Sequence, residues 1–467
     1  MLITTDESHC KFIADYLRRN SLWRLPGVES KFARLWRISP SLFSLDTEIV
    51  KILERLGSAI WSFYSAVNRL YLSGNYPWVN EYLDIGKPDS LIEHAHMNYQ
   101  KRMLPRVIRP DILLTEQGLR VTEFDSVPGG IGLTAAMSIA YGQCGQESIG
   151  GTEGMLSGFN AMLSDVSGID NPAVAILVSD ESADYRPEME WLASELRVRG
   201  RSVWAVRPEE VIFTEDAIFI DVENQRVKID VIYRFYELFD LKNIPKAELI
   251  AYAAKKKLVM VTPPYKHHLE EKLLLALISH PMLEDWFLSE MEEGEFFLLR
   301  EVVSPTWVLD SRLVPPHALI PGFRFRGKAV QDWRVIEDAT QKERRLVIKP
   351  SGFSPLAWGS RGVVVGHDVS SDKWAAAVES ALTNFNSSPS VLQEFHDSKR
   401  VRVRYYDESS DCVVEMDGRV RLCPYYFVEG DGVKLRGVLA TIVPLDKKFI
   451  HGMLDAVMVP CMVEGNA

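Results

Sequence analysis

Residues 108–130, IRPDILLTEQGLRVTEFDSVPGG, constrain the fold of this 467-residue chain more than any other segment. Two apolar-rich stretches flank the polar segment Glu116–Gly118, whose glycine suits a left-handed backbone position. This pattern is typical of a β-hairpin closed by a three-residue loop. If Thr115 pairs with Leu119, every other cross-strand pair follows from that register.

In that register the hairpin carries four charged side chains on one face. Asp111 lies opposite Glu123, Arg109 lies opposite Asp125, and the other face is apolar, with Ile112, Leu114 and Phe124. Opposed carboxylates repel, so a cation among them would favour the arrangement, and oxygen ligands of this kind suit magnesium. The alternative is a solvent-exposed strand face on which Arg109 screens the acids. A slip of one residue would separate the group.

A strand–helix–strand pattern begins near residue 170. The apolar run at 173–181 is followed by an amphipathic helix over 185–200 and a second strand at 201–210, which together predict a βαβ unit and a parallel sheet. A further strand is expected in IDVIYRFYELFDL. A dinucleotide-binding turn needs glycines after the first strand, and SDESADYRPE has none, so an NAD-linked enzyme is disfavoured.

A second group of chemically informative residues lies downstream. In RLVIKPSGFSPLAWGSRGVVVG, a strand ends at Lys349 and is followed by Gly359, Ser360, Arg361 and Gly362. A lysine at a strand end and a glycine-bearing loop suit phosphate groups, although the Walker A order is missing and a plain hairpin is an equal alternative. The next strand enters Gln393, Glu394 and Phe395, which could border an adenine; Lys272 begins an expected helix.

Composition and charge narrow the class of protein. Residues 1 to about 105 have helical periodicity, with Ser44 or Asp46 as the candidate cap of the main helix. The formal net charge of −11 gives no general attraction to nucleic acid or anionic lipid. Five scattered cysteines without a Cys-x-x-Cys pair, and no signal peptide or membrane span, favour a cytoplasmic protein with reduced thiols.

Other polar patterns have simpler interpretations. The pairs His94/His96 and His267/His268 are expected at the surface rather than on a metal. Arg400, Arg402 and Arg404 alternate with valines, as on a strand whose basic face meets either substrate carboxylates or water.

Taken together, these motifs resemble the ATP-grasp ligases, in the circularly permuted order of the synthetase domain of glutathionylspermidine synthase. The segment TEFDSVPGG resembles the family's E-x-N-x-x-P-G motif, yet it precedes Lys349 by more than 200 residues. Arg109-Pro110-Asp111 followed by Glu123-Phe124-Asp125 matches the pattern R-x-D and then E-x-N, with Asp125 replacing the usual asparagine.

The resemblance implies a role for each matched residue. Asp111, Glu123 and Asp125 would hold two magnesium ions, and Lys272 and Lys349 would contact ATP phosphates. Further nucleotide contacts would come from Gly359, Ser360, Arg361 and Gly362, and from Gln393, Glu394 and Phe395 around the adenine. Arg109 and Arg436, the latter in KLRGVLATI, would be the catalytic arginines.

The resemblance also implies fold and activity. We expect a mixed α/β, α+β protein with a circularly permuted ATP-grasp fold, divided into a helical region (1–105), a metal-binding hairpin with core helices (106–165), a Rossmann-like domain (166–255) and a nucleotide-binding region (256–467) with a lid at about 295–345. The implied activity is ATP-dependent joining of a small-molecule or peptide carboxylate to an amine. The alternative is a catalytically silent nucleotide-binding or interaction protein.

Overall fold

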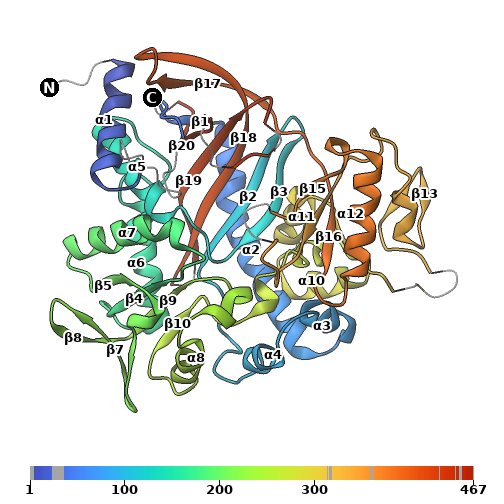
Figure 1. The fold of residues 1–467 in the computed structure, drawn as a ribbon, viewed down its shortest axis with the longest axis horizontal. Coiled ribbons are helices and arrows are strands. Elements are labelled where there is room, and N and C mark those ends of the chain that lie inside the picture. The colour runs from blue at the N-terminus through green and yellow to red at the C-terminus, as the bar shows by residue number, and fades with distance from the viewer. Residues whose placement is uncertain are drawn as a thin grey trace.

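The computed structural model describes residues 5–23, 36–312, 314, 318–357, 361–430, 432–447, 449–451 and 455–465. Gly359 and Ser360 of the expected phosphate loop lie outside the described residues. The fold is mixed α/β and contains several sheets, as the sequence predicts (Figure 1). Within the described part of the chain, no helix is both long and apolar enough to span a bilayer.

A seven-stranded sheet forms the centre of the molecule and joins the two ends of the sequence. Its strand order is β1-β20-β19-β18-β2-β3, and β17 pairs with the first half of β18. The strands are β1 (Phe43–Leu45), β2 (Val107–Thr115), β3 (Gly118–Asp125), β17 (Arg400–Asp407), β18 (Cys412–Glu429), β19 (Gly432–Pro444) and β20 (Val457–Val463). The predicted hairpin is β2–β3, and it pairs with β18 from the far end of the sequence.

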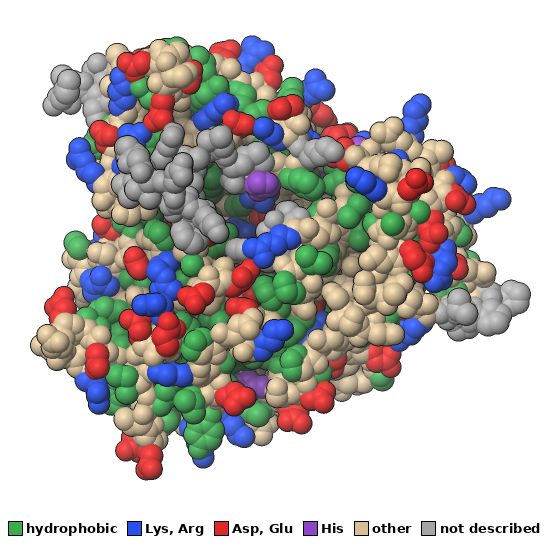
Figure 2. Space-filling model, viewed as in Figure 1, with side chains coloured by type: hydrophobic (Ala, Val, Ile, Leu, Met, Phe, Trp, Pro, Cys, Tyr) green, Lys and Arg blue, Asp and Glu red, His purple; other side chains and the backbone are tan. Residues whose placement is uncertain are grey.

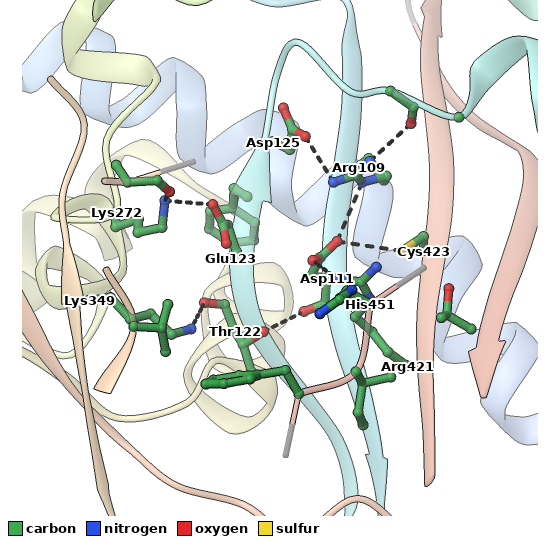
Figure 3. A pocket seen from close by; sticks show the side chains of 18 of the residues that line it. Arg109, Asp111, Thr122, Glu123, Asp125, Lys272, Lys349, Arg421, Cys423 and His451 are labelled. Carbon is green, nitrogen blue, oxygen red and sulfur yellow. Dashed lines mark hydrogen bonds and ion pairs between the residues drawn. The ribbon is translucent and has the colours of Figure 1, made fainter. Parts of the chain in front are cut away.

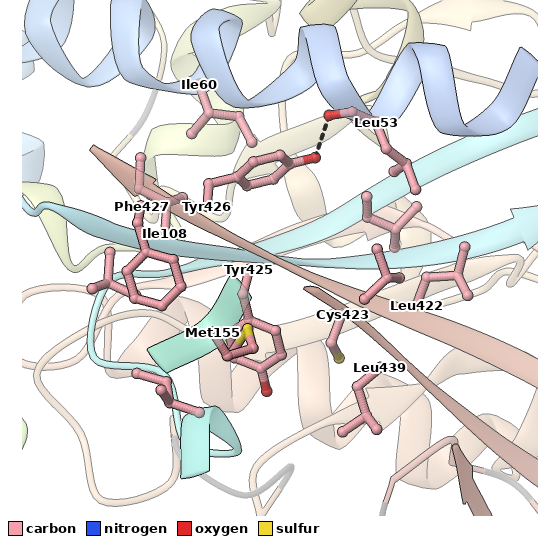
Figure 4. Packing of buried hydrophobic residues seen from close by; sticks show 14 of the residues in the cluster. Leu53, Ile60, Ile108, Met155, Leu422, Cys423, Tyr425, Tyr426, Phe427 and Leu439 are labelled. Atoms are coloured by element: carbon pink, nitrogen blue, oxygen red, sulfur yellow. Dashed lines mark hydrogen bonds between the residues drawn. The ribbon is translucent and has the colours of Figure 1, made fainter. Parts of the chain in front are cut away.

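Helices cover both faces of this sheet. The long helix α2 (Thr47–Ser73) begins at Asp46, whose side chain accepts a hydrogen bond from the Glu48 backbone N–H, so Asp46 is the cap. It packs on the face where Tyr426 donates a hydrogen bond to the Leu53 carbonyl (Figure 4). The neighbouring Tyr425 points to the opposite face, which is covered by α5 (Ile131–Gln143) and α6 (Gly154–Ser167).

Further helices pack around this core. In the amino-terminal part they are α1 (Asp6–Arg19), α3 (Pro77–Asp84) and α4 (Asp89–Ala95). From the middle of the chain come α9 (Leu274–Ile278), α10 (Glu284–Glu290) and α11 (Glu293–Val302). Both α10 and α11 contact α2, and α11 overlaps the start of the segment expected as a lid.

The predicted βαβ unit is present as part of a parallel four-stranded sheet of order β10-β9-β4-β5. Its strands are β4 (Val174–Val178), β5 (Val203–Val206), β9 (Val231–Phe235) and β10 (Met260–Thr262), with α7 (Arg186–Val198) and α8 (Ala247–Lys255) between them. A small antiparallel sheet, β6 (Ile212–Phe213), β7 (Ile218–Val222) and β8 (Gln225–Ile229), is inserted before β9.

A third sheet carries Lys349. Its order is β11-β16-β14-β15, with β11 (Thr306–Val308), β14 (Leu346–Pro350), β15 (Val364–Val365) and β16 (Ser390–Glu394), and it packs against α12 (Ser371–Thr383). A two-stranded hairpin, β12 (Arg324–Phe325) and β13 (Lys328–Ala329), lies beside it (Figure 1). This unit has its own apolar cluster around Trp333 and Trp374, separate from the core of the central sheet.

The contact between α2 and β18 depends on a glycine, which gives the first testable prediction. A Cβ at Gly57 would lie 2.5 Å from Cδ1 of Tyr426, so Gly57→Ala should destabilise the protein by about 1–3 kcal/mol, although alanine gains about 1 kcal/mol in helix propensity. The matched control is Gly294→Ala in the exposed first turn of α11, where no atom lies within 4 Å. The unfolding midpoint in urea should fall for the first variant only; equal midpoints would contradict this packing.

Candidate functional site

The hairpin keeps the predicted charged pairs, but by a different route. Thr115 pairs with Gly118 instead of Leu119, so the expected turn register is wrong by one residue. A β-bulge between the turn and the charged residues adds one unpaired residue, Thr122, to β3. Asp111 therefore still lies opposite Glu123, and Arg109 still lies opposite Asp125.

The bulge also links the hairpin to the third sheet. Because Thr122 has no partner in the β2–β3 ladder, its carbonyl is available to other donors. It accepts a hydrogen bond from Lys349 Nζ at 3.1 Å (Figure 3). It accepts another from Gln393 Nε2 at 3.3 Å. Gln393 also accepts from Lys349 at 2.8 Å and donates to Thr306 Oγ1 at 3.0 Å. Gln393 therefore positions a lysine, in addition to lying at the cavity wall.

Each carboxylate on the charged face of the hairpin has a basic partner. Arg109 lies 2.9 Å from Asp125 and 3.4 Å from Asp111, and Lys272 lies 2.7 Å from Glu123 (Figure 3). The second partner of Asp111 is Arg421 of β18, at 2.7 Å. These side chains are largely buried, so the charged face is neither open to solvent nor screened by Arg109 alone.

The surroundings shift the pKa values of Asp111 and Asp125 in opposite directions. Burial acts to raise the pKa of Asp111, but Arg421 and Arg109 outweigh it and hold the pKa below its ordinary value. Burial raises the pKa of Asp125 above its ordinary value, and repulsion from Glu123 adds to this despite the attraction of Arg109. A cation bound beside Asp125 would lower this pKa again.

The two lysines differ in the same way. Burial lowers the pKa of Lys349 to about 8. Repulsion from Lys272 also lowers this pKa, whereas attraction to Glu123 raises it. Burial also acts to lower the pKa of Lys272, but its ion pair with Glu123 raises it above the ordinary value. Lys272 lies in the turn before the short helix α9, and its Nζ also donates to the Ala357 carbonyl at 3.0 Å.

These groups line one cavity of about 780 Å³, within the size range of small-molecule sites. Its wall combines the hairpin and β18 with the segments after β9 and β14 and the end of β16. Arg361, Glu394 and Phe395 line it as well, and Arg361 pairs with Glu181 at 3.0 Å. In the space-filling view the surface is hollowed between the central sheet and the third sheet (Figure 2).

Two predicted residues lie apart from the cavity wall. Arg436 donates to Glu429 at 2.6 Å and packs against α6 near Gly158, so the structure does not bring it to the hairpin. Gly362 is not in the wall either; a Cβ there would lie 2.6 Å from the Pro350 ring, which makes it a packing glycine of the loop after β14.

The arginine that sequence reasoning missed is Arg421. It lies on β18 with Arg419, Cys423 and Tyr425, and all four line the cavity at two-residue spacing. The same alternation occurs at Arg400, Arg402 and Arg404, but there Arg402 is exposed and pairs with Asp417. The alternation of arginines around residue 421 is a signal in the sequence. However, only the pairing of β18 with β2 shows that these arginines face the cavity and that those at 400–404 do not.

The histidine expectation is wrong for three residues. His94, His267 and His268 are buried rather than at the surface. His268 stacks on Tyr71 with ring centroids 4.0 Å apart, and His267 lies 2.8 Å from Asp84. Aromatic and polar partners within the helical region therefore make their burial possible.

The donor set suits a magnesium ion that arrives with phosphate. Among the described residues no three acidic, histidine or cysteine side chains are grouped closely enough to hold a metal by themselves. Magnesium is usually held by one or two carboxylates together with substrate phosphates, rather than by an all-protein cage. Glu123 and Asp125, on neighbouring positions of one strand face, fit that requirement.

Comparisons with known proteins support the fold. Searches against protein-family profiles and curated proteins gave no match. Among solved structures, a glutathione synthetase-like effector from Globodera pallida in its apo form aligns with a TM-score of 0.59 at 12% identity, over 98% of this chain and 96% of that one. This chain therefore shares the fold of that protein.

A second solved structure, from Methylobacillus flagellatus KT and provisionally assigned as a gamma-glutamylcysteine synthetase, aligns with a TM-score of 0.40 at 12% identity, over 86% of this chain and 87% of that one.

The charges around Lys349 predict the direction in which its pKa changes in two variants. In the wild type, Lys349 should lose its proton near pH 8 rather than at the ordinary 10.5. Lys272→Met removes a repelling charge and frees Glu123, so the pKa of Lys349 should rise. Glu123→Gln removes an attracting charge, so it should fall. NMR of ¹³C-dimethylated lysines measures all three; shifts of the opposite sign would contradict the arrangement.

Proposed function

We propose that this protein is an ATP-dependent carboxylate–amine ligase of the ATP-grasp type. The observation that carries the proposal is the convergence in one cavity of the acidic hairpin, Arg109 and Arg421, and two lysines from separate segments. The fold shared with a glutathione synthetase-like effector supports the same class. The order of these parts, with the hairpin more than 200 residues before Lys349, supports a circularly permuted arrangement like that of glutathionylspermidine synthase.

In this proposal the cavity binds ATP at the third sheet. Lys272 and Lys349 neutralise the β- and γ-phosphates, and Glu394 and Phe395 border the adenine. The parallel sheet β10-β9-β4-β5 would be the Rossmann-like domain that precedes the nucleotide-binding region of the ATP-grasp fold. Magnesium, held by Glu123 and Asp125 with Asp111 nearby, would neutralise charge that develops on the transferred phosphoryl group.

The reaction needs little covalent chemistry from the protein. A substrate carboxylate oxygen attacks the γ-phosphorus and ADP leaves, which produces an acylphosphate. The amine then attacks the acyl carbon, loses a proton, and phosphate leaves with the bridging oxygen. Arg109 and Arg421, fixed by Asp111, lie where they can hold the carboxylate and then the oxyanion. The substrates we expect are a small acid or peptide and an amine.

The direct test is a screen of acid and amine pairs read by ADP release, with mass spectrometry of the product. Glu123→Ala and Asp111→Ala should abolish turnover while the circular dichroism spectrum is retained. A protein that binds Mg-ATP but releases ADP with no pair would support the alternative, a catalytically silent nucleotide-binding module.

The five free cysteines support a cytoplasmic location.

Variants of Arg421 and Arg436 test which of these two arginines is catalytic, because the sequence resemblance implied Arg436 and the structure favours Arg421. Arg421→Met should lower kcat by about 10²–10³-fold, as for loss of a transition-state donor. Arg436→Met should leave kcat near the wild-type value and cost about 0–1 kcal/mol of stability, because its ion pair with Glu429 is partly exposed. The reverse result would return the catalytic role to Arg436.

A further inference from the structure

A buried ion pair beside the cavity joins the amino-terminal helices to the site. Lys87, in the turn between α3 and α4, pairs with Glu271, and neither side chain has any exposed surface. Neither residue lines the cavity. Burying two charges costs desolvation energy, and an apolar pair of similar size often packs as well. Stability alone therefore does not account for this pair.

The carboxylate of Glu271 is held on its other side by the loop after β14. The Ser351 hydroxyl donates to it and in turn accepts a hydrogen bond from the Leu273 backbone N–H at 3.0 Å. Gly352, with φ of +52°, lies so close that a Cβ there would be 1.8 Å from Glu271 Oε1. Only glycine permits this approach. Glu271 thus holds its own segment and the loop together.

These two segments carry the two lysines of the cavity. Lys272 directly follows Glu271, and Lys349 stands two residues before Ser351. The hydrogen bond from Lys272 Nζ to the Ala357 carbonyl, at 3.0 Å, joins the same two segments a second time. A change in the position of the Glu271 carboxylate would therefore alter the spacing of the two ammonium groups.

We propose that Glu271, with Lys87 as its counter-ion and Ser351 as its link, is a positioning residue that sets the spacing of Lys272 and Lys349 for a polyphosphate. The phosphate-binding role of the lysines rests on the proposed function; the positioning itself does not. Because Lys87 lies between α3 and α4, the amino-terminal helical region would contribute to nucleotide binding through Glu271.

The test compares Ser351→Ala with Ser39→Ala, a buried serine whose hydroxyl bonds to the Ser41 backbone. Titration calorimetry with Mg-ATP should show a Kd about tenfold higher for Ser351→Ala, comparable with the loss of one hydrogen bond to a charged group. The Kd for AMP, which lacks the β- and γ-phosphates, should be unchanged, and Ser39→Ala should alter neither. Equal losses for ATP and AMP would mean general damage and would overturn the proposal.

A second readout does not depend on nucleotide. Acetylation of Lys272 and Lys349 with limiting acetic anhydride, followed by mass spectrometry, should be faster in Ser351→Ala than in the wild type and in Ser39→Ala. Unchanged labelling would overturn the positioning role. A wild type that fails to bind Mg-ATP, together with faster labelling in Ser351→Ala, would overturn the proposed function and support the positioning role.

Discussion

The unpaired residue Thr122 is the constraint on which the site depends. The bulge that it forms places Asp111 opposite Glu123 and Arg109 opposite Asp125, and all four side chains line the cavity. The same bulge frees the carbonyl that accepts from Lys349 and Gln393, and so attaches the third sheet to the central one. Without an extra residue in β3, the charged face and the lysine contact would both be lost, because a shift of one residue reverses the faces of a strand.

A second constraint is the pairing of β2 with β18. It places Leu113 opposite Arg421 and thereby sets that arginine against Asp111, although more than 300 residues separate the two in the sequence. The result is a site in which acidic and basic side chains are paired, in a chain with a net charge of −11. Basic groups gather in the cavity because acidic strands hold them there, and they provide the positive charge that a polyanionic ligand needs.

Much of this arrangement could be predicted from local patterns. The hairpin, the cap at Asp46 and the parallel βαβ unit follow from turn chemistry and periodicity, which act over a few residues. The bulge could not be predicted, because no local signal marks Thr122 as the extra residue. Arg421 was missed for a different reason: alternating arginines occur twice, and only a long-range strand pairing makes one set face the cavity. The buried histidines likewise depend on partners distant in sequence.

The measurement that tests the central claim most directly is isotope transfer from the acid substrate. With an acid and amine pair that the protein joins in the presence of ATP, a carboxylate labelled with ¹⁸O should deliver one labelled oxygen to each inorganic phosphate formed, because the acylphosphate bridging oxygen leaves with phosphorus. Unlabelled phosphate, formed with oxygen from ordinary water, would mean simple ATP hydrolysis. Labelled AMP with pyrophosphate would mean an acyl-adenylate, and either result would contradict the account.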